Sequence, residues 1–431
     1  MQIKNKKNSS TAFILTLIFP IGGLIYTLSH WREKWAKNTF WLACIYMGAV
    51  LIYWPEGIAL GEGGDGGRYV LRLMDMYSNS NVSISSILSN YLSDDGVTMD
   101  LYQPLMTYLI SRFTDNGHVL FATFALVFGF FYSRNIWYIL EKLPKKKFGG
   151  LFIIVTLYFL ICPITSINGV RMWTALHVFV YGMMPYLLTK DRSKLLWVLL
   201  TPLIHFSFLY VAIFAVVWFL LPYQWKTQNS FFLTIALVFF VVTLFVNTIN
   251  LNAVGGMLAE YSPEAYEEHI GGYTNEDYAS NRADARALNN WYVAASGNVT
   301  HWCYNLLLLA LLPCLKRNFK KNRGLMHLYV FALLLGGFAN IMALIPSGGR
   351  FQLLSQMFKV PLILLVAMSI PKSDKFRQLV TISLFFLLLP FVFEIRKIFD
   401  YFSITVLLGN FVTVFFWENN VPIMDFIKRL I

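Results

Sequence analysis

The sequence predicts an all-α polytopic membrane protein with about 11–13 transmembrane or re-entrant helices. The first observation is composition: of the 431 residues, 57% are hydrophobic, 17% are aromatic and only 13% are charged, which is too few polar residues to cover a water-soluble surface. The second is a series of apolar runs close to the about 20 residues that a helix needs to cross the hydrocarbon core. The third is that Lys and Arg gather in short clusters between these runs, where they orient membrane helices.

The apolar runs are the predicted membrane helices. They lie at residues 38–54, 117–140, 149–163, 170–189, 229–247, 301–315, 325–345, 351–370, 378–394 and 402–417. The sequence contains no internal repeat and no separate soluble segment. Residues 1–431 are therefore predicted to form a single membrane-embedded domain.

Basic clusters between the runs predict the orientation. Under the positive-inside rule they face the cytoplasm, and they are Lys142–Lys147, Lys190–Lys194, Lys316–Arg323 and Lys372–Arg377. Two long extracytoplasmic loops follow from this, at residues 55–116 and 248–300, with short outer turns near 164–170, 346–350 and 395–401. The net charge of +12 resides largely in such clusters, so nucleic acid is not an expected partner.

Residues 194–222 predict a hairpin inside the membrane. Lys194 and Lys226 are both expected in the cytoplasm, so the chain between them must cross an even number of times. The run is too short for two full crossings, and Pro202 interrupts it. We therefore expect two short helices that turn near Pro202–His205 in the outer half of the bilayer.

The N-terminal run poses the same problem. Basic residues lie on both sides of it, at Lys4–Lys7 and at Arg32–Lys37. A broken re-entrant pair of helices around Pro20, Gly22 and Gly23 satisfies both clusters. A single span with the N-terminus outside is the alternative, and it violates the positive-inside rule.

Four charged or polar segments reach the predicted outer boundary from distant parts of the chain. An unpaired charge in hydrocarbon costs several kcal/mol and usually marks function. Each segment also has a structural explanation: a surface ion pair, a helix cap, a satisfied histidine or an interfacial arginine. Their convergence favours a site made of Asp65, Arg68 and Arg72 in the first loop, Asn168 and Arg171, His205, and Arg350.

The same segments carry a family resemblance. Asp-x-x-x-Tyr (Asp65, Tyr69), Asn-x-x-Arg-x-x-x-Ala (Asn168, Arg171, Ala175), His-x-Ser (His205, Ser207) and a late Arg350 occur in this order. The series resembles the EpsG-like family of bacterial polysaccharide polymerases, related in role to Wzy-type O-antigen and capsule polymerases. It covers most of residues 1–360, and Met172 stands where a Gln is common in the family.

The resemblance implies a GT-C-like membrane glycosyltransferase in the bacterial inner membrane. It implies a polyprenyl-diphosphate-linked oligosaccharide as substrate, with membrane lipid around it, and a chain-length regulator and a lipid-linked sugar flippase as partner proteins. It leaves the sugar unspecified.

The residue types suit this chemistry independently. Such a polymerase must stabilise a departing diphosphate and deprotonate an alcohol. Arginine binds phosphate oxygens bidentately and never loses its charge. The candidates for the diphosphate are Arg68, Arg72, Arg171 and Arg350, with Tyr69 and Asn168 beside them, and the base is either Asp65 or His205.

No cofactor is expected. A divalent cation held by Asp94, Asp95 and Asp100 is an alternative that we do not favour, because several arginines already face the leaving group. The four cysteines, Cys44, Cys162, Cys303 and Cys314, lack the spacing of a transition-metal site.

Two other function classes stay open. A flippase for lipid-linked sugars would also have many spans, but it predicts charges near the bilayer midplane and repeated halves. A membrane acyltransferase that modifies polysaccharide would use a histidine-based site such as His205. Gene deletion separates the three: loss of a polymerase leaves single lipid-linked repeat units, loss of a flippase traps them inside, and loss of an acyltransferase still permits long chains.

Overall fold

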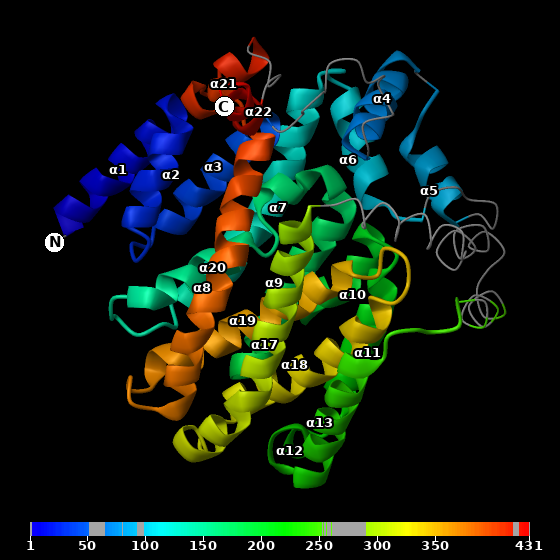
Figure 1. Ribbon diagram of the computed structural model, residues 1–431. Coiled ribbons are helices and arrows are strands. Elements are labelled where there is room, and N and C mark those ends of the chain that lie inside the picture. The colour runs from blue at the N-terminus through cyan, green and yellow to red at the C-terminus, as the bar shows by residue number, and fades with distance from the viewer. Residues whose placement is uncertain are drawn as a thin grey trace.

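Helices account for nearly all regular structure in the part of the chain that we describe. The computed structural model describes residues 2–50, 65–79, 81–92, 99–251, 253, 256, 260, 290–416 and 422–430. Within these ranges the only β pairing is an isolated bridge between Ser403 and Pro422. The predicted all-α class is confirmed, and Figure 1 shows the helices gathered into one bundle.

Six apolar segments in the described residues are long enough to cross a membrane. They comprise α7 (Gly117–Leu140), α8 (Phe152–Leu160) joined through η2 (Ile164–Gly169) to α9 (Val170–Thr189), α17 (Trp291–Asn318), α18 (Arg323–Met342), α19 (Arg350–Ser369) and α20 (Lys375–Tyr401). Shorter helices include α3 (Ala36–Val50) and α13 (Ser230–Phe245). This confirms a multi-pass membrane protein.

Asparagine and aspartate side chains begin several of these helices. Asn116 accepts a hydrogen bond from the backbone N–H of His118 at 2.8 Å, Asn229 from Phe232 at 3.1 Å, and Asp374 from Phe376 at 2.9 Å. Each bond satisfies a backbone donor that the first helical turn leaves without a partner.

Helix α19 forms the centre of the bundle, and 83% of its apolar stretch is buried. Helix α20 lies at the periphery, where only 22% of its apolar stretch is buried. Lys359 lies in this centre, 4% exposed. Its ammonium donates to Asn305 Oδ1 at 2.8 Å, and the Asn305 amide lies 3.1 Å from His301 Nε2. The polar contacts offset part of the cost of a buried cation.

The predicted break in the N-terminal run is confirmed. Helix α1 (Gln2–Ile18) ends one residue before Phe19, and α2 (Pro20–Ser29) begins with proline at its first position. The two helices fold back on each other, and a Cβ added at Gly23 would lie 2.5 Å from the Thr16 Cα. Only glycine permits this close approach.

The predicted hairpin at residues 194–222 is also confirmed. Helix α10 (Leu195–Ile204) contains Pro202, and the chain becomes extended at His205 before α11 (Phe208–Leu220). Ten residues make α10 about 15 Å long, about half of the hydrocarbon thickness. Helix α10 alone is therefore too short to cross the membrane.

Residues 402–417 do not form the predicted membrane span. The described part of this range, residues 402–416, contains only the short helices α21 (Ile404–Leu408) and η4 (Thr413–Phe415). The Asn410 side chain accepts hydrogen bonds from the backbone N–H groups of Val412 and Thr413, at 2.9 and 3.1 Å, and this local turn competes with a continuous helix.

The predicted outer turn at 395–401 is wrong as well, because α20 continues to Tyr401. Arg396 pairs with Asp400 at 3.5 Å, and Lys397 pairs with Glu394 at 2.9 Å. Ion pairs at these spacings stabilise a helical turn in water. The charged residues at 394–400 therefore continue the helix instead of ending it.

The remaining short helices lie around the two ends of the bundle. The first long loop contains α4 (Asp65–Ser78), α5 (Ile84–Leu92) and α6 (Tyr102–Ser111), which stand together at the upper right of Figure 1. The others are η1 (Gly149–Leu151), α12 (Tyr223–Gln228) and α22 (Ile423–Leu430).

Basic clusters from separate loops meet at the other end of the bundle. Arg32 donates to the Lys146 carbonyl at 2.9 Å, Lys37 pairs with Glu141 at 3.4 Å, and Arg317 pairs with Asp374. The clusters that the positive-inside rule assigns to the cytoplasm thus share one end.

Labelling of single cysteines tests which side this end faces. In a background without the native cysteines, Asn290→Cys is expected to react with an impermeant maleimide in intact cells, and Lys145→Cys only after the membrane is opened. Both positions are exposed. The reverse pattern would contradict the predicted orientation.

Candidate functional site

Five segments meet at the end of the bundle opposite the basic clusters. They are α4 and α6 from the first loop, η2 with the first turn of α9, the break between α10 and α11, and the first turn of α19. The predicted outer groups lie on these segments. Their side chains define the candidate site.

Helix α4 brings the first motif to the site. Asp65 and Tyr69 are four residues apart, so they lie on neighbouring turns of one face. Asp65 forms an exposed ion pair with Arg68 at 3.5 Å. Behind them, a Cβ added at Gly66 would lie 3.0 Å from Asn168 Oδ1. The start of α4 therefore packs directly on the second motif.

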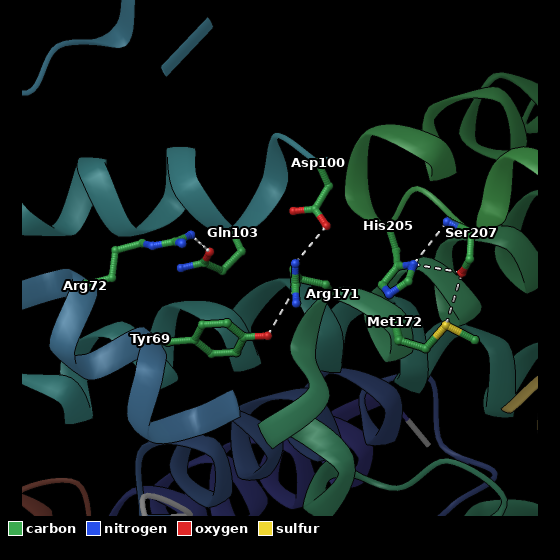
Figure 2. A network of polar contacts seen from close by, with 8 residues as sticks. All are labelled: Tyr69, Arg72, Asp100, Gln103, Arg171, Met172, His205 and Ser207. Carbon is green, nitrogen blue, oxygen red and sulfur yellow. Dashed lines mark hydrogen bonds and ion pairs between the residues drawn. The ribbon is translucent and has the colours of Figure 1, made fainter. Parts of the chain in front are cut away.

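Arg171 is the centre of the site, as Figure 2 shows. Its Nε donates to the Tyr69 hydroxyl at 3.2 Å, and its Nη1 donates to Asp100 Oδ2 at 3.2 Å. No acceptor for Nη2 is recorded among the described residues, and the side chain is 35% exposed.

Asp100 is a site residue whose role the sequence analysis did not foresee, since it appeared there only as a metal ligand. The side chain is 2% exposed. Burial raises the pKa of its carboxyl to about 6, and the Arg171 guanidinium opposes this rise. Asp100 thus balances part of the charge of Arg171 without any bound ligand.

Arg72 does not reach Arg171 and binds a separate partner. Its Nη1 donates to Gln103 Oε1 at 2.7 Å, and Gln103 in turn donates to Thr107 at 2.8 Å (Figure 2). Burial and the nearby charge of Arg171 lower the pKa of Arg72. Gln103 was also missed from sequence, because a buried amide on a short helix carries no pattern of its own.

The break after α10 fixes His205. The backbone N–H of Ser207 donates to His205 Nδ1 at 3.2 Å, and the Ser207 hydroxyl lies 2.8 Å from the same nitrogen. Because Nδ1 accepts the backbone bond, Nε2 carries the proton of the neutral ring. In Figure 2, Nε2 points away from Ser207, toward the side where Arg171 lies.

Met172 closes the other side of the Ser207 hydroxyl. Its sulfur lies 3.8 Å from Ser207 Oγ. The residue that departs from the usual family pattern therefore contacts the third motif directly.

Arg350 enters the site from α19. The preceding turn is tight: Ser347 has a φ of 66°, and a Cβ added at Gly348 would lie 1.8 Å from the Met342 carbonyl oxygen. The next residue, Phe351, packs against Phe208 with ring centroids 6.2 Å apart. The start of α19 therefore lies beside the break that holds His205, although 179 positions separate Arg350 from Arg171 in the sequence.

Arg68 lies at the rim. Its side chain is 67% exposed, and its ion pair with Asp65 is the contact that we observe.

Two predicted features lie largely outside the described residues. Asp94 and Asp95 are among the residues that we do not describe, as are most of residues 248–300. The described residues contain no group of three His, Cys, Asp or Glu side chains arranged for a metal.

Comparison with known proteins bears on the motifs that build this site. The sequence matches the EpsG family over residues 57–406, which is more than half of the chain. The chain belongs to the EpsG family. This is a family of polysaccharide polymerase-like membrane proteins, and the match includes every residue of the candidate site. Comparisons with curated proteins and with solved structures found no match.

Membership in the EpsG family agrees with the geometry. The first two motifs are about a hundred residues apart, yet they meet in the Tyr69–Arg171 hydrogen bond. The start of α19, which carries Arg350, packs beside the third motif through the rings of Phe351 and Phe208. The ordered motifs of the sequence are thus one cluster in space.

Proposed function

We propose that this EpsG-family chain is a glycosyltransferase that joins lipid-diphosphate-linked oligosaccharide repeat units into a surface polysaccharide. The reaction takes place on the extracytoplasmic side of the bacterial inner membrane. The observation that carries the proposal is the clustering of the motifs around Arg171, at the end of the bundle opposite the basic clusters.

In this proposal Arg171 and Arg350 bind the diphosphate of the donor. The Nη2 of Arg171 can donate to a phosphate oxygen, because Nε already donates to Tyr69 and Nη1 to Asp100. A guanidinium fixed in this way needs little reorganisation to stabilise the charge that develops on the leaving group. The arginines fulfil the role that a divalent cation would otherwise have.

Asp65 acts as the base in this scheme, and His205 acts as a hydrogen-bond donor. His205 Nδ1 is occupied by the Ser207 N–H, so the proton-bearing Nε2 is the nitrogen left to donate to a ligand. The Asp65 carboxylate is 37% exposed and acts electrostatically on Tyr69 and Arg171, which places it beside the arginine without enclosing it.

Asp100 positions Arg171 and gives the reaction an acid limit. As pH falls through about 6, the carboxylate that accepts from Arg171 becomes neutral, and polymer synthesis is expected to decline. The Asp100→Asn variant should synthesise polymer at a lower rate, and this rate should not change with pH in this range. An unchanged inflection near pH 6 in Asp100→Asn would assign the titration to another group.

The same pKa has a consequence for stability. The folded chain takes up this proton at higher pH than the unfolded chain, whose aspartate has an ordinary value near 3.8. The contribution of Asp100 to the free energy of unfolding is therefore largest below about pH 4 and decreases as pH rises through about 6.

Reconstitution tests the proposed function. The purified chain in lipid vesicles would receive lipid-linked oligosaccharide extracted from cells that lack its gene. We expect a ladder of polymer lengths with the wild type and none with Arg171→Ala. Unchanged single units with the wild type would overturn the proposal. Units that only change membrane side would indicate a flippase, and acylated units an acyltransferase.

A further inference from the structure

An apolar cavity of about 600 Å³ lies between two pairs of helices. One wall comes from α2 and α3, and the other comes from α8 and the end of α20; these helices stand at the left of the bundle in Figure 1. Its lining includes Ile21, Ala43, Met47, Thr156, Phe159 and Ile398. Within the described part of the chain, no charged side chain lines it.

The cavity extends along the membrane-spanning direction of α8. Its lining runs from Phe152 to Leu160, a length of about 12 Å at the helical rise, and continues to Thr165. At the end nearest the basic clusters, Trp31 and Phe148 stack with ring centroids 5.3 Å apart. These two rings line that end of the cavity.

The other end of the cavity is lined by residues that precede the candidate site in the chain. Pro163, Ile164 and Thr165 line it, and η2 then carries the chain to Asn168 and Arg171. Arg171 is the sixth residue after Thr165, which is about 12 Å along the chain at the rise of a 3₁₀-helix. The uncharged lining of the cavity thus ends within about 12 Å of the backbone that carries Arg171.

This arrangement matches an amphiphile with an anionic head and one long apolar chain. We infer that the cavity holds the polyisoprenoid tail of the lipid-linked substrate while the diphosphate binds at Arg171. The inference rests on the proposed function, because that function supplies the diphosphate head. The positive charge of Arg171 complements the diphosphate, and the uncharged lining of the cavity complements the polyisoprenoid tail.

Physical chemistry limits what the cavity contributes. Bilayer lipid is as apolar as the cavity walls, so the tail gains no hydrophobic free energy by leaving the bilayer. What the cavity contributes is orientation: it aligns the substrate so that the diphosphate meets Arg171. Blocking it should therefore weaken the use of long-tailed donors and spare donors with a short tail.

Thr156→Trp tests this, with Thr234→Trp as the matched control. Thr156 lines the cavity on α8, whereas Thr234 is exposed on α13, away from the cavity. We expect Thr156→Trp to raise the KM for a long polyprenyl donor about tenfold and to leave the KM for a short-chain donor unchanged. Thr234→Trp should change neither. Equal effects on both donors, or none, would overturn the inference.

A second variant distinguishes loss of tail binding from a folding defect. Leu160→Trp narrows the same cavity one helical turn away, and the melting temperature of each variant reports whether the fold is kept. If both variants fold and neither distinguishes the two donors, the cavity does not hold the tail.

A binding measurement separates this inference from the proposed function. The probe is a polyprenyl diphosphate without sugar, with a photoreactive diazirine in its tail, which needs no turnover. We expect labelled peptides from α3 and α8, with competition by polyprenyl phosphate but not by excess phosphatidylglycerol. Equal competition by phosphatidylglycerol would identify an ordinary phospholipid site and overturn the inference.

The combined outcomes are distinguishable. Labelling of α3 and α8 in a chain that makes no polymer would support the tail site and reject the polymerase. Polymer formation with labelling only elsewhere would retain the polymerase and reject the tail site.

Discussion

Arg171→Ala is expected to abolish polymer synthesis, and Arg171→Lys to retain only a small part of it. Lysine keeps the charge but cannot donate at once to Tyr69, to Asp100 and to a phosphate oxygen in one plane. Loss of a preorganised donor to a developing anion typically reduces kcat by about 10²–10³-fold. Steady-state rates of the purified variants would measure the order wild type, Lys, Ala.

Arg134→Ala is the matched control. Arg134 is a half-buried arginine on α7 that donates to Asn38 at 2.7 Å, and it lies at the basic end of the bundle. It should keep its rate. Because Arg171→Ala also leaves a buried carboxylate without its cation, the double variant Arg171→Ala with Asp100→Asn is needed. Restored activity in the double variant would show that Arg171 matters only as the partner of Asp100.

Asp65→Asn is expected to reduce the rate by about 10²–10⁴-fold, as loss of a general base does. Asparagine keeps the size of the side chain but cannot accept the proton of the alcohol. The effect should fall on kcat with little change in melting temperature, since the carboxylate is partly exposed. Asp75→Asn, at an exposed position of the same helix, should be active.

His205 variants complete this test. If Nε2 acts as a donor, His205→Gln retains more activity than His205→Ala, because an amide N–H can replace it. If His205 is the base instead, Gln and Ala are equally inactive and Asp65→Asn is active. That result would reverse the roles assigned above.

Much of the architecture could be predicted from local chemistry. Proline marks the breaks at Pro20 and near His205, because it removes a backbone donor and disfavours a continued helix. Alternating apolar runs and basic clusters indicate the order of the spans. These signals reside within a few neighbouring residues, so a single sequence contains them.

The pairings within the site could not be predicted in the same way. Asp100 meets Arg171 across 71 positions, and Arg72 meets Gln103 across 31, with no periodicity that relates them. The sequence predicts Arg171 as a ligand for the diphosphate but does not reveal that a buried carboxylate of the chain itself, Asp100, pairs with it. The false span at 402–417 had the opposite cause, since hydropathy does not register the turn that one side chain, Asn410, imposes.

The first loop and the hairpin also share a backbone hydrogen bond, from the Leu101 N–H to the Leu203 carbonyl at 2.9 Å. This bond joins the residue after Asp100 to the last turn of α10, two residues before His205. In engineering terms, residues 99–107 and 195–207 form one exchangeable module. A chimera that takes either segment alone from another family member would disturb the setting of Asp100, whereas a chimera that takes both would keep the Leu101–Leu203 bond and leave Asp100 to pair with the Arg171 of the host.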